Sequence, residues 1–249
     1  MTVGAGRLSP STLMAILQPW AEVAESIDER IARLADAAPG CEALWVGCGS
    51  GRSVLWWAER FGTRIEGVDP DARAIETADA AARDADLARL VTLQVSAAEN
   101  LPHEADVFDL TVVNMLYLSG ADGREVFAQA ARVARPMSVV VVLVPSWFST
   151  PAPADAADVA KLGIRPHLLV EWKNYMREAG LVELTVEDAA HDGRWIAPEW
   201  LGLLIRGWRA ARWRGVGIVL GSEMRSLRKL ARTRVLGLSM IRGTRWPYA

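Results

Sequence analysis

The chain has 249 residues, of which 51% are hydrophobic and 23% charged, and its formal net charge is −2. This composition provides enough apolar side chains for one sizeable core and excludes a disordered chain. The apolar runs are far too short for a membrane-spanning helix. The two cysteines, Cys41 and Cys48, are too few for a disulfide scaffold or a cysteine metal cluster, and no metal site is expected.

Residues 1–39 are predicted to form a helical cap. Apolar side chains recur at helical spacing from Leu13 to Ile31, and Pro19 is expected to divide this stretch into two helices. The stretch lacks the basic segment, apolar run and small-residue cleavage site of a secretory signal. We therefore expect a cytoplasmic protein.

From residue 40 onward, short apolar runs alternate with stretches of helical period. The runs predict strands at Ala43–Gly47, Arg64–Asp69, Val91–Val95, Leu110–Met115 and Val139–Val144. The intervening stretches predict helices at Ser53–Phe61, Asp71–Arg83 and Glu125–Ala134. Strands that are apolar on both faces and separated by helices are typical of a parallel sheet covered on both sides. The sequence therefore predicts an α/β fold with a doubly wound, mostly parallel sheet.

The second half of the chain is less regular. Ser149–Ala157 is rich in Pro, Ala and Asp, which predicts a surface connection. His167–Ala179 is expected to be a helix, Val182–Val186 a strand and Val235–Ile241 the last strand. Between these last two strands lies an insertion rich in Trp and Arg.

The segment between Ala43 and Arg52 contains the clearest chemical signal. A predicted strand ends in Gly47-x-Gly49-x-Gly51, and a predicted helix follows. Glycines permit a tight turn and a close approach of a ligand to the backbone, and the helix N-terminus offers N–H groups that have no partner within the helix. The next strand ends at Asp69, where a carboxylate can accept both hydroxyls of a ribose. This pair predicts a nucleoside-containing ligand.

The order of these motifs is specific to one kind of nucleoside site. Arg52 stands where the dinucleotide fingerprint has its third glycine, and the chain has no Gly-Lys-Ser/Thr of a P-loop. Together with the glycine loop, the chain resembles the class I S-adenosylmethionine-dependent methyltransferases of the small-molecule type at four further segments: Glu66–Pro70, Val95–Pro102, Val107–Leu110 and Ala131–Pro136. The resemblance implies a seven-stranded Rossmann-like sheet with helical cap elements. It also implies in-line transfer of a methyl group from S-adenosylmethionine, with S-adenosylhomocysteine as the product.

The resemblance also implies which residues contact the cofactor. They are Val46, Gly47, Cys48, Gly49, Gly51, Asp69, Pro70, Ala97, Ala98, Glu99, Asn114 and Met115. Asp69 would hold the ribose hydroxyls, Ala98 and Glu99 would lie near the adenine, and Asn114 and Met115 would border the methyl group. Two positions depart from the family pattern: Trp45 replaces an acid before the glycine loop, and Ala97 replaces an acid after the third strand. Adenine recognition would then depend on Glu99 or on backbone groups.

The predicted organisation is a single methyltransferase domain over residues 1–249. Residues 40–145 would be the cofactor-binding half, residues 1–39 a cap and residues 146–249 a substrate-side half that contains the Trp/Arg-rich insertion. The acceptor is expected to be a small hydrophobic or aromatic molecule. A module that binds the cofactor without catalysis is the alternative from another class, and a membrane-associated lipid methyltransferase or an RNA methyltransferase is the alternative among enzymes.

Three residues are candidates for catalysis. Asn114 and Tyr117 keep part of a pattern with which some amine methyltransferases hold a planar amine, but both prolines of that pattern are missing and Tyr117 could be pocket wall alone. His191 could be a general base or a solvated loop histidine. An apolar substrate pocket is predicted from aromatic residues of several segments: Trp20, Tyr117, Trp147, Phe148, Trp195 and Trp200.

The C-terminal segment from residue 199 is strongly basic. It carries ten Arg and one Lys against two Glu, and residues 199–214 are predicted to form a helix with Trp and aliphatic side chains on one arc. Peripheral contact with an anionic membrane, a nucleic-acid surface and simple packing on the sheet are all open interpretations. Nucleic acid is the least favoured partner because lysine is nearly absent and the basic residues alternate with long aliphatic runs. The acceptor atom and the oligomeric state are left open by the sequence.

Overall fold

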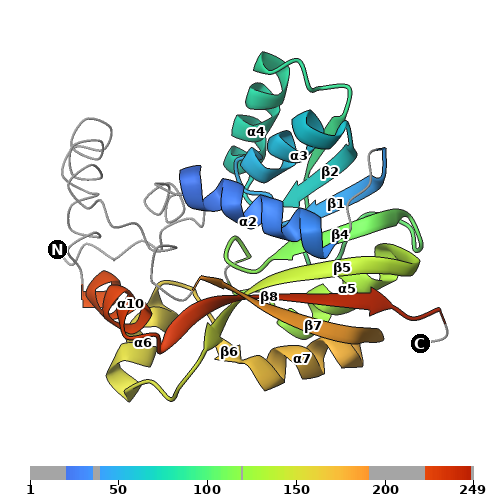
Figure 1. The fold of residues 1–249 in the computed structure, drawn as a ribbon. Coiled ribbons are helices and arrows are strands. Elements are labelled where there is room, and N and C mark those ends of the chain that lie inside the picture. The colour runs from blue at the N-terminus through green and yellow to red at the C-terminus, as the bar shows by residue number, and fades with distance from the viewer. Residues whose placement is uncertain (1–20, 36–39, 119, 191–221, 248–249) are drawn as a thin grey trace.

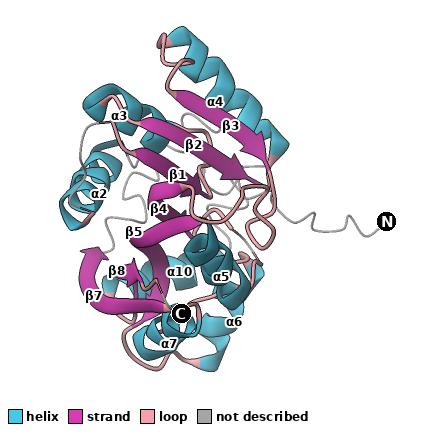
Figure 2. Ribbon diagram, turned by 90° about the vertical axis from the view of Figure 1, so that its right-hand side faces the viewer, coloured by secondary structure: helices cyan, strands magenta, loops and turns pink. Residues whose placement is uncertain are grey.

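The computed structural model describes residues 21–35, 40–118, 120–190 and 222–247, and it shows one eight-stranded sheet with helices on both faces (Figures 1 and 2). The strands are β1 (Glu42–Val46), β2 (Arg64–Asp69), β3 (Val91–Val95), β4 (Phe108–Asn114), β5 (Ala134–Trp147), β6 (His167–Leu168), β7 (Leu181–Ala190) and β8 (Leu236–Arg245). The helices are α2 (Ala21–Leu34), α3 (Arg52–Phe61), α4 (Ala72–Asp84), α5 (Gly123–Val133), α6 (Pro153–Lys161), α7 (Leu169–Glu178) and α10 (Ser222–Arg232).

The strand order is β3-β2-β1-β4-β5-β8-β7, with the two-residue strand β6 paired to β5. β1 to β5 run parallel, and β8 is antiparallel to both of its neighbours, β5 and β7. From β1 the chain first builds outward to β3 and then returns to the other side of β1. The crossover connections therefore diverge between β1 and β4, and ligands of open α/β sheets bind at the carboxyl ends of such strands. The predicted doubly wound, mostly parallel sheet is confirmed.

Two apolar cores lie on opposite faces of the sheet. One core is covered by α2, α3, α4, α6 and α10, and it contains Trp45 and Trp57, whose ring centroids are 6.0 Å apart. The other is covered by α5 and α7, where Phe127 and Trp172 approach to 5.7 Å. The central strands are buried on both faces, which explains why they appear in the sequence as continuous apolar runs without alternation.

Most predicted elements of the cofactor half are present, and the corrections lie in the second half. The surface connection at Ser149–Ala157 is wrong, because Pro153 starts α6, a position that proline favours. The predicted helix at His167–Ala179 starts only at Leu169, since the two preceding residues pair with β5 as β6. Helix α10 was not predicted, because its buried residues are separated by basic ones. Among the described helices, none has the length and hydropathy needed to cross a membrane.

Candidate functional site

The loop between β1 and α3 is built around three glycines with positive φ. Gly47, Gly49 and Gly51 have φ angles of +75°, +54° and +80°, a region that side chains disfavour. Neighbours also exclude a side chain at each position: a Cβ on Gly47 would lie 2.6 Å from the Asn114 carbonyl oxygen, and one on Gly49 would lie 2.3 Å from Cε1 of Tyr117. The Gly47 N–H donates to the carbonyl of Val68 over 2.8 Å, which fixes the loop to the end of β2.

Asp69, the last residue of β2, connects this loop to the next helix. Its carboxylate accepts hydrogen bonds from the Gly49 N–H over 2.8 Å and from the Asp71 N–H over 2.9 Å. Only 2% of the side chain is exposed, and this burial raises the pKa of Asp69 to about 6, against the opposing effect of the two hydrogen bonds. A carboxylate has about four acceptor positions, so that Asp69 can accept further hydrogen bonds from ribose hydroxyls. The geometry of Asp69 therefore fits a nucleoside.

The start of α3 faces a second buried acid. Gly51 caps the helix without a side-chain hydrogen bond, and the first turn contains no acid of its own. The Ser53 hydroxyl donates instead to the carboxylate of Asp28 on α2, over 3.1 Å. Asp28 was not predicted from the sequence to be a site residue. Its signal was present, because Asp28 falls on the buried stripe of Ile27 and Ile31.

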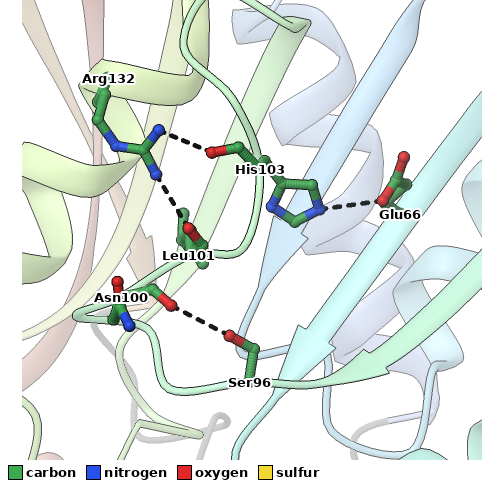
Figure 3. Close-up of polar contacts among 6 residues, drawn as sticks. All are labelled: Glu66, Ser96, Asn100, Leu101, His103 and Arg132. Atoms are coloured by element: carbon green, nitrogen blue, oxygen red, sulfur yellow. Dashed lines mark hydrogen bonds and ion pairs between the residues drawn. The ribbon is translucent and has the colours of Figure 1, made fainter.

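The loop that follows β3 is fastened on two sides, as Figure 3 shows. The guanidinium of Arg132, in the last turn of α5, donates to the carbonyls of Leu101 over 3.0 Å and His103 over 2.7 Å. His103 Nε2 lies 3.0 Å from the Glu66 carboxylate on β2. This loop, residues 96–103, contains the residues predicted to lie near the adenine. Its anchors were also missed, because nothing in sequence distinguishes Arg132 from a solvated arginine at a helix end.

The predicted adenine residues occupy different environments within the 96–103 loop. Ala98 is buried, whereas Ala97 is exposed. The Glu99 carboxylate accepts the Asp122 N–H at the start of α5 over 3.3 Å. Glu99 therefore connects this loop to α5, and hydrogen bonds to the adenine can also come from backbone groups.

The end of β4 brings two of the predicted catalytic residues against the glycine loop. The Asn114 side chain accepts the Leu116 N–H over 3.1 Å, and the Asn114 carbonyl accepts the Tyr117 N–H over 3.2 Å. The resulting turn places the Tyr117 ring on Gly49. Burial raises the pKa of Tyr117 to about 12, with smaller contributions from the charges of Asp69 and Asp28. The phenol is therefore protonated at neutral pH and cannot act as a general base there.

The remaining cofactor residues predicted from the resemblance are mostly buried. Val46 and Met115 pack in the core beneath α5 and α7, so only their backbone atoms can border a ligand. Cys48 is also buried, which raises the pKa of its thiol far above the usual range and keeps it protonated. Pro70 is exposed between Asp69 and Asp71.

The structure tests only part of the predicted substrate pocket. Trp147 and Phe148 are half-buried at the carboxyl end of β5, and the Phe148 ring packs against Gly237 of β8. Four further predicted residues lie outside the described part of the chain, together with the helix expected at 199–214: Trp20, His191, Trp195 and Trp200. In the described residues, no group of three His, Cys, Asp or Glu side chains could hold a metal ion.

Comparison with known proteins identifies the family. Residues 43–137 match the family model described as methyltransferase domain. Methyltransferase GfsG of Streptomyces halstedii is 25% identical over 189 residues, which cover 73% of this chain and 67% of that protein. The 27-O-demethylrifamycin SV methyltransferase of Amycolatopsis mediterranei (strain S699) is 28% identical over 193 residues, 73% and 70% of the two chains. The chain is a class I S-adenosylmethionine-dependent methyltransferase. The glycine loop, Asp69 and the 96–103 loop of this methyltransferase all lie within the matched region.

Solved structures agree with this methyltransferase in fold. The [4+2]-cyclase SpnF superposes with a TM-score of 0.73 at 20% identity, over 91% of this chain and 83% of that one. The geranyl diphosphate C-methyltransferase from Streptomyces coelicolor A3(2), in complex with Mg²⁺, geranyl diphosphate and S-adenosylhomocysteine, gives 0.68 at 18% identity, over 89% and 77%. At such identities the likeness shows the fold alone. Since one of these neighbours is a [4+2]-cyclase, the fold does not by itself specify the acceptor or the reaction.

Proposed function

We propose that this methyltransferase transfers a methyl group from S-adenosylmethionine to a small hydrophobic or aromatic acceptor. The observation that carries the proposal is the meeting of the glycine loop, Asp69 and Tyr117 at the carboxyl ends of β1, β2 and β4. In this arrangement Asp69 accepts the ribose hydroxyls, the 96–103 loop borders the adenine, and the backbone of the glycine loop borders the methionyl chain.

The chemistry requires orientation more than proton transfer. When bound, S-adenosylmethionine supplies a methyl group attached to a positively charged sulfur. An acceptor that attacks the methyl carbon in line displaces this sulfur as the leaving group. The protein's part is to place the acceptor behind that carbon and to exclude water. Tyr117, protonated at neutral pH, can donate a hydrogen bond to the acceptor but cannot remove its proton. His191 is the proposed base for acceptors that lose a proton.

Several half-buried aromatic side chains support an apolar acceptor. Trp147 is the last residue of β5, Phe148 follows it, and Tyr117 follows the end of β4, so all three lie at the edge where open α/β sheets bind ligands. The names of the relatives specify acceptor atoms of different kinds. The acceptor atom is an oxygen for the 27-O-demethylrifamycin SV methyltransferase and a nitrogen for the norajmaline N-methyltransferase of Rauvolfia serpentina. This range supports a small-molecule acceptor and leaves its atom open.

We extend the proposal to the organisation of the chain and its location. Residues 40–145 form the cofactor half, and residues 1–39 and 146–249 cover the acceptor. The free thiols of Cys41 and Cys48 support a reducing, cytoplasmic compartment.

Calorimetry followed by a turnover assay tests this proposal. S-adenosylmethionine and S-adenosylhomocysteine should bind with micromolar affinity, and NADH should not bind. Asp69→Ala should abolish cofactor binding. The control is Asp79→Ala, which removes a half-exposed acid of α4 and should leave cofactor binding unchanged. A panel of phenols, aromatic amines and apolar alcohols should then yield S-adenosylhomocysteine. Cofactor binding without turnover on any acceptor would favour the non-catalytic module, and salt-sensitive retention on RNA or anionic vesicles would favour a nucleic-acid or lipid acceptor.

A further inference from the structure

Helices α6 and α10 lie side by side near the carboxyl end of β5 (Figures 1 and 2). Their inner sides share one apolar core, to which α6 contributes Val159 and α10 contributes Leu227 and Leu230. Trp147, the last residue of β5, pairs with Leu236, which begins β8 shortly after α10 ends. The outer sides of the two helices therefore form one surface, next to the edge of the sheet at which the acceptor is proposed to bind.

The outer side of α10 is strongly basic. The helix contains four basic residues against one acid, Glu223. Arg225, Lys229 and Arg232 are exposed, and their spacing of four and three residues places them on one side of the helix. Arg234, just beyond the helix, is also exposed. Within the described part of the chain, no carboxylate pairs with Arg225, Arg232 or Arg234, so these three guanidinium groups face solvent.

Both acids of α6 point toward α10 and are largely covered. The Asp155 carboxylate accepts from Nζ of Lys229 over 2.7 Å. The Asp158 carboxylate accepts from the Ser226 hydroxyl over 2.8 Å and from Nζ of Lys161 over 2.9 Å. Their side chains are only 14% and 17% exposed. These two acids neutralise the two lysines, and the positive charge that remains on this side of the molecule belongs to the arginines.

The outer side of α6 is uncharged along most of its length. It exposes small apolar residues at helical spacing, Ala154, Ala157 and Ala160, beside the basic side of α10. The name α6–α10 face is used below for these alanines together with Arg225, Lys229, Arg232 and Arg234. This face combines unpaired positive charge with small apolar side chains.

We propose that the α6–α10 face docks the enzyme on an anionic lipid surface. Anionic headgroups attract Arg and Lys side chains within about a Debye length, and this attraction needs no pocket. A surface for single-stranded nucleic acid usually adds aromatic side chains that stack on bases, and a protein docking site adds large apolar side chains at its centre. The described residues of the α6–α10 face include neither kind. The inference goes beyond the proposed function, because docking does not require the cofactor.

Sedimentation with lipid vesicles measures the docking directly. The protein should sediment with vesicles of phosphatidylglycerol and phosphatidylcholine, should not sediment with vesicles of phosphatidylcholine alone, and should be released by about 0.5 M NaCl. Each basic residue near an anionic surface contributes about fivefold to binding. Arg225→Gln/Arg232→Gln should therefore lower the partition coefficient about 10- to 30-fold.

Matched variants separate docking by this face from a general effect of charge. Arg73→Gln/Arg89→Gln removes two exposed arginines near β3, at the other edge of the sheet, and should lower the partition coefficient less than about twofold. Ala157→Asp adds an acid to the α6–α10 face and should weaken docking about fivefold, whereas Ala157→Asn should leave it unchanged. Every variant should bind S-adenosylhomocysteine as the unaltered protein does, which verifies that it is folded.

Several results would overturn the proposal. No sedimentation with the anionic vesicles, equal sedimentation with both kinds of vesicle, or an unchanged partition of Arg225→Gln/Arg232→Gln would mean that this face does not dock on anionic lipid. An equal loss in Arg73→Gln/Arg89→Gln would assign the attraction to net charge. Release from the vesicles by poly(U), with retention of the protein on that RNA, would assign the face to nucleic acid.

None of these results depends on cofactor binding, so the failure of docking leaves the proposed function intact. Conversely, a protein that docks but does not bind S-adenosylmethionine would retain this inference and lose the proposed function. Vesicles without an added acceptor should yield no S-adenosylhomocysteine. If they do yield it, docking stands and the lipid itself is the acceptor.

Discussion

Acidification from pH 7 to pH 5 is expected to weaken cofactor binding about tenfold through the protonation of Asp69. Burial raises the pKa of this carboxyl to about 6, and the ionised form is the one that can accept two ribose hydroxyls. With a pKa near 6, its ionised fraction falls from about nine-tenths at pH 7 to about one-tenth at pH 5, which corresponds to about 1.4 kcal/mol of binding free energy. Affinity is therefore close to its full value at pH 7 and above, and it decreases progressively as the pH falls through 6.

The stability of the cofactor-free protein should depend on pH in the opposite sense. Since the folded pKa of Asp69 is raised above its unfolded value of 3.8, the folded state binds the proton more tightly. The contribution of Asp69 to the free energy of unfolding is largest below pH 4 and decreases by up to about 3 kcal/mol as the pH rises through 6.

Calorimetric titration with S-adenosylhomocysteine at pH 5, 6 and 7 and constant ionic strength measures the effect. Asp69→Asn serves as the control, because it should bind weakly at every pH with little dependence. A dissociation constant of the unaltered protein that stays level between pH 5 and 7 would refute the reasoning, as would an equal pH dependence in Asp69→Asn.

Two substitutions test the loops around the site, and a third tests a residue with positive φ near the start of β5. Arg132→Met removes the donors to the carbonyls of the 96–103 loop. It should weaken S-adenosylhomocysteine binding about tenfold and lower the free energy of unfolding by about 1–3 kcal/mol. Unchanged binding would mean that this loop does not contact the cofactor. Gly49→Ala would bring a Cβ within 2.3 Å of Tyr117 and should abolish binding, with partial recovery in Gly49→Ala/Tyr117→Ala; no recovery would place the strain in the backbone. Met137 is exposed and has a φ of +64°, a conformation that favours glycine. Met137→Gly should therefore raise the free energy of unfolding by up to about 1 kcal/mol, measured by urea titration. A decrease would mean that the methionine side chain stabilises the fold.

The elements that the sequence predicted best are those whose local pattern and tertiary environment agree. β2 and β3 occupy the predicted residues because short apolar runs between turn residues admit few alternatives. Helix α10 was not predicted because its buried residues, Leu227 and Leu230, alternate with arginine and lysine residues. These long side chains extend toward solvent and obscure the apolar face in the sequence.

The residues of the site also differ in whether local sequence predicts them or distant contacts determine them. The glycine loop and Asp69 could be located from spacing along the chain, since adjacent parallel strands bring their carboxyl ends together. Asp28 and Arg132 could not, because each reaches its partner across a gap between elements that are far apart in sequence. Asp28 contacts Ser53, and Arg132 contacts the carbonyls of a loop about 30 residues before it.

The position of β8 has a consequence for how the polypeptide folds during synthesis. β8 is made after β7 but lies between β5 and β7 in the sheet. Until Leu236–Arg245 has left the ribosome, β5 is an open sheet edge and β7 has no neighbour to pair with. The strands β1 to β4, which surround the cofactor site, can assemble while the chain is still growing. The opposite edge of the sheet closes in a single late step, before which β5 and β7 are exposed to pairing with other chains.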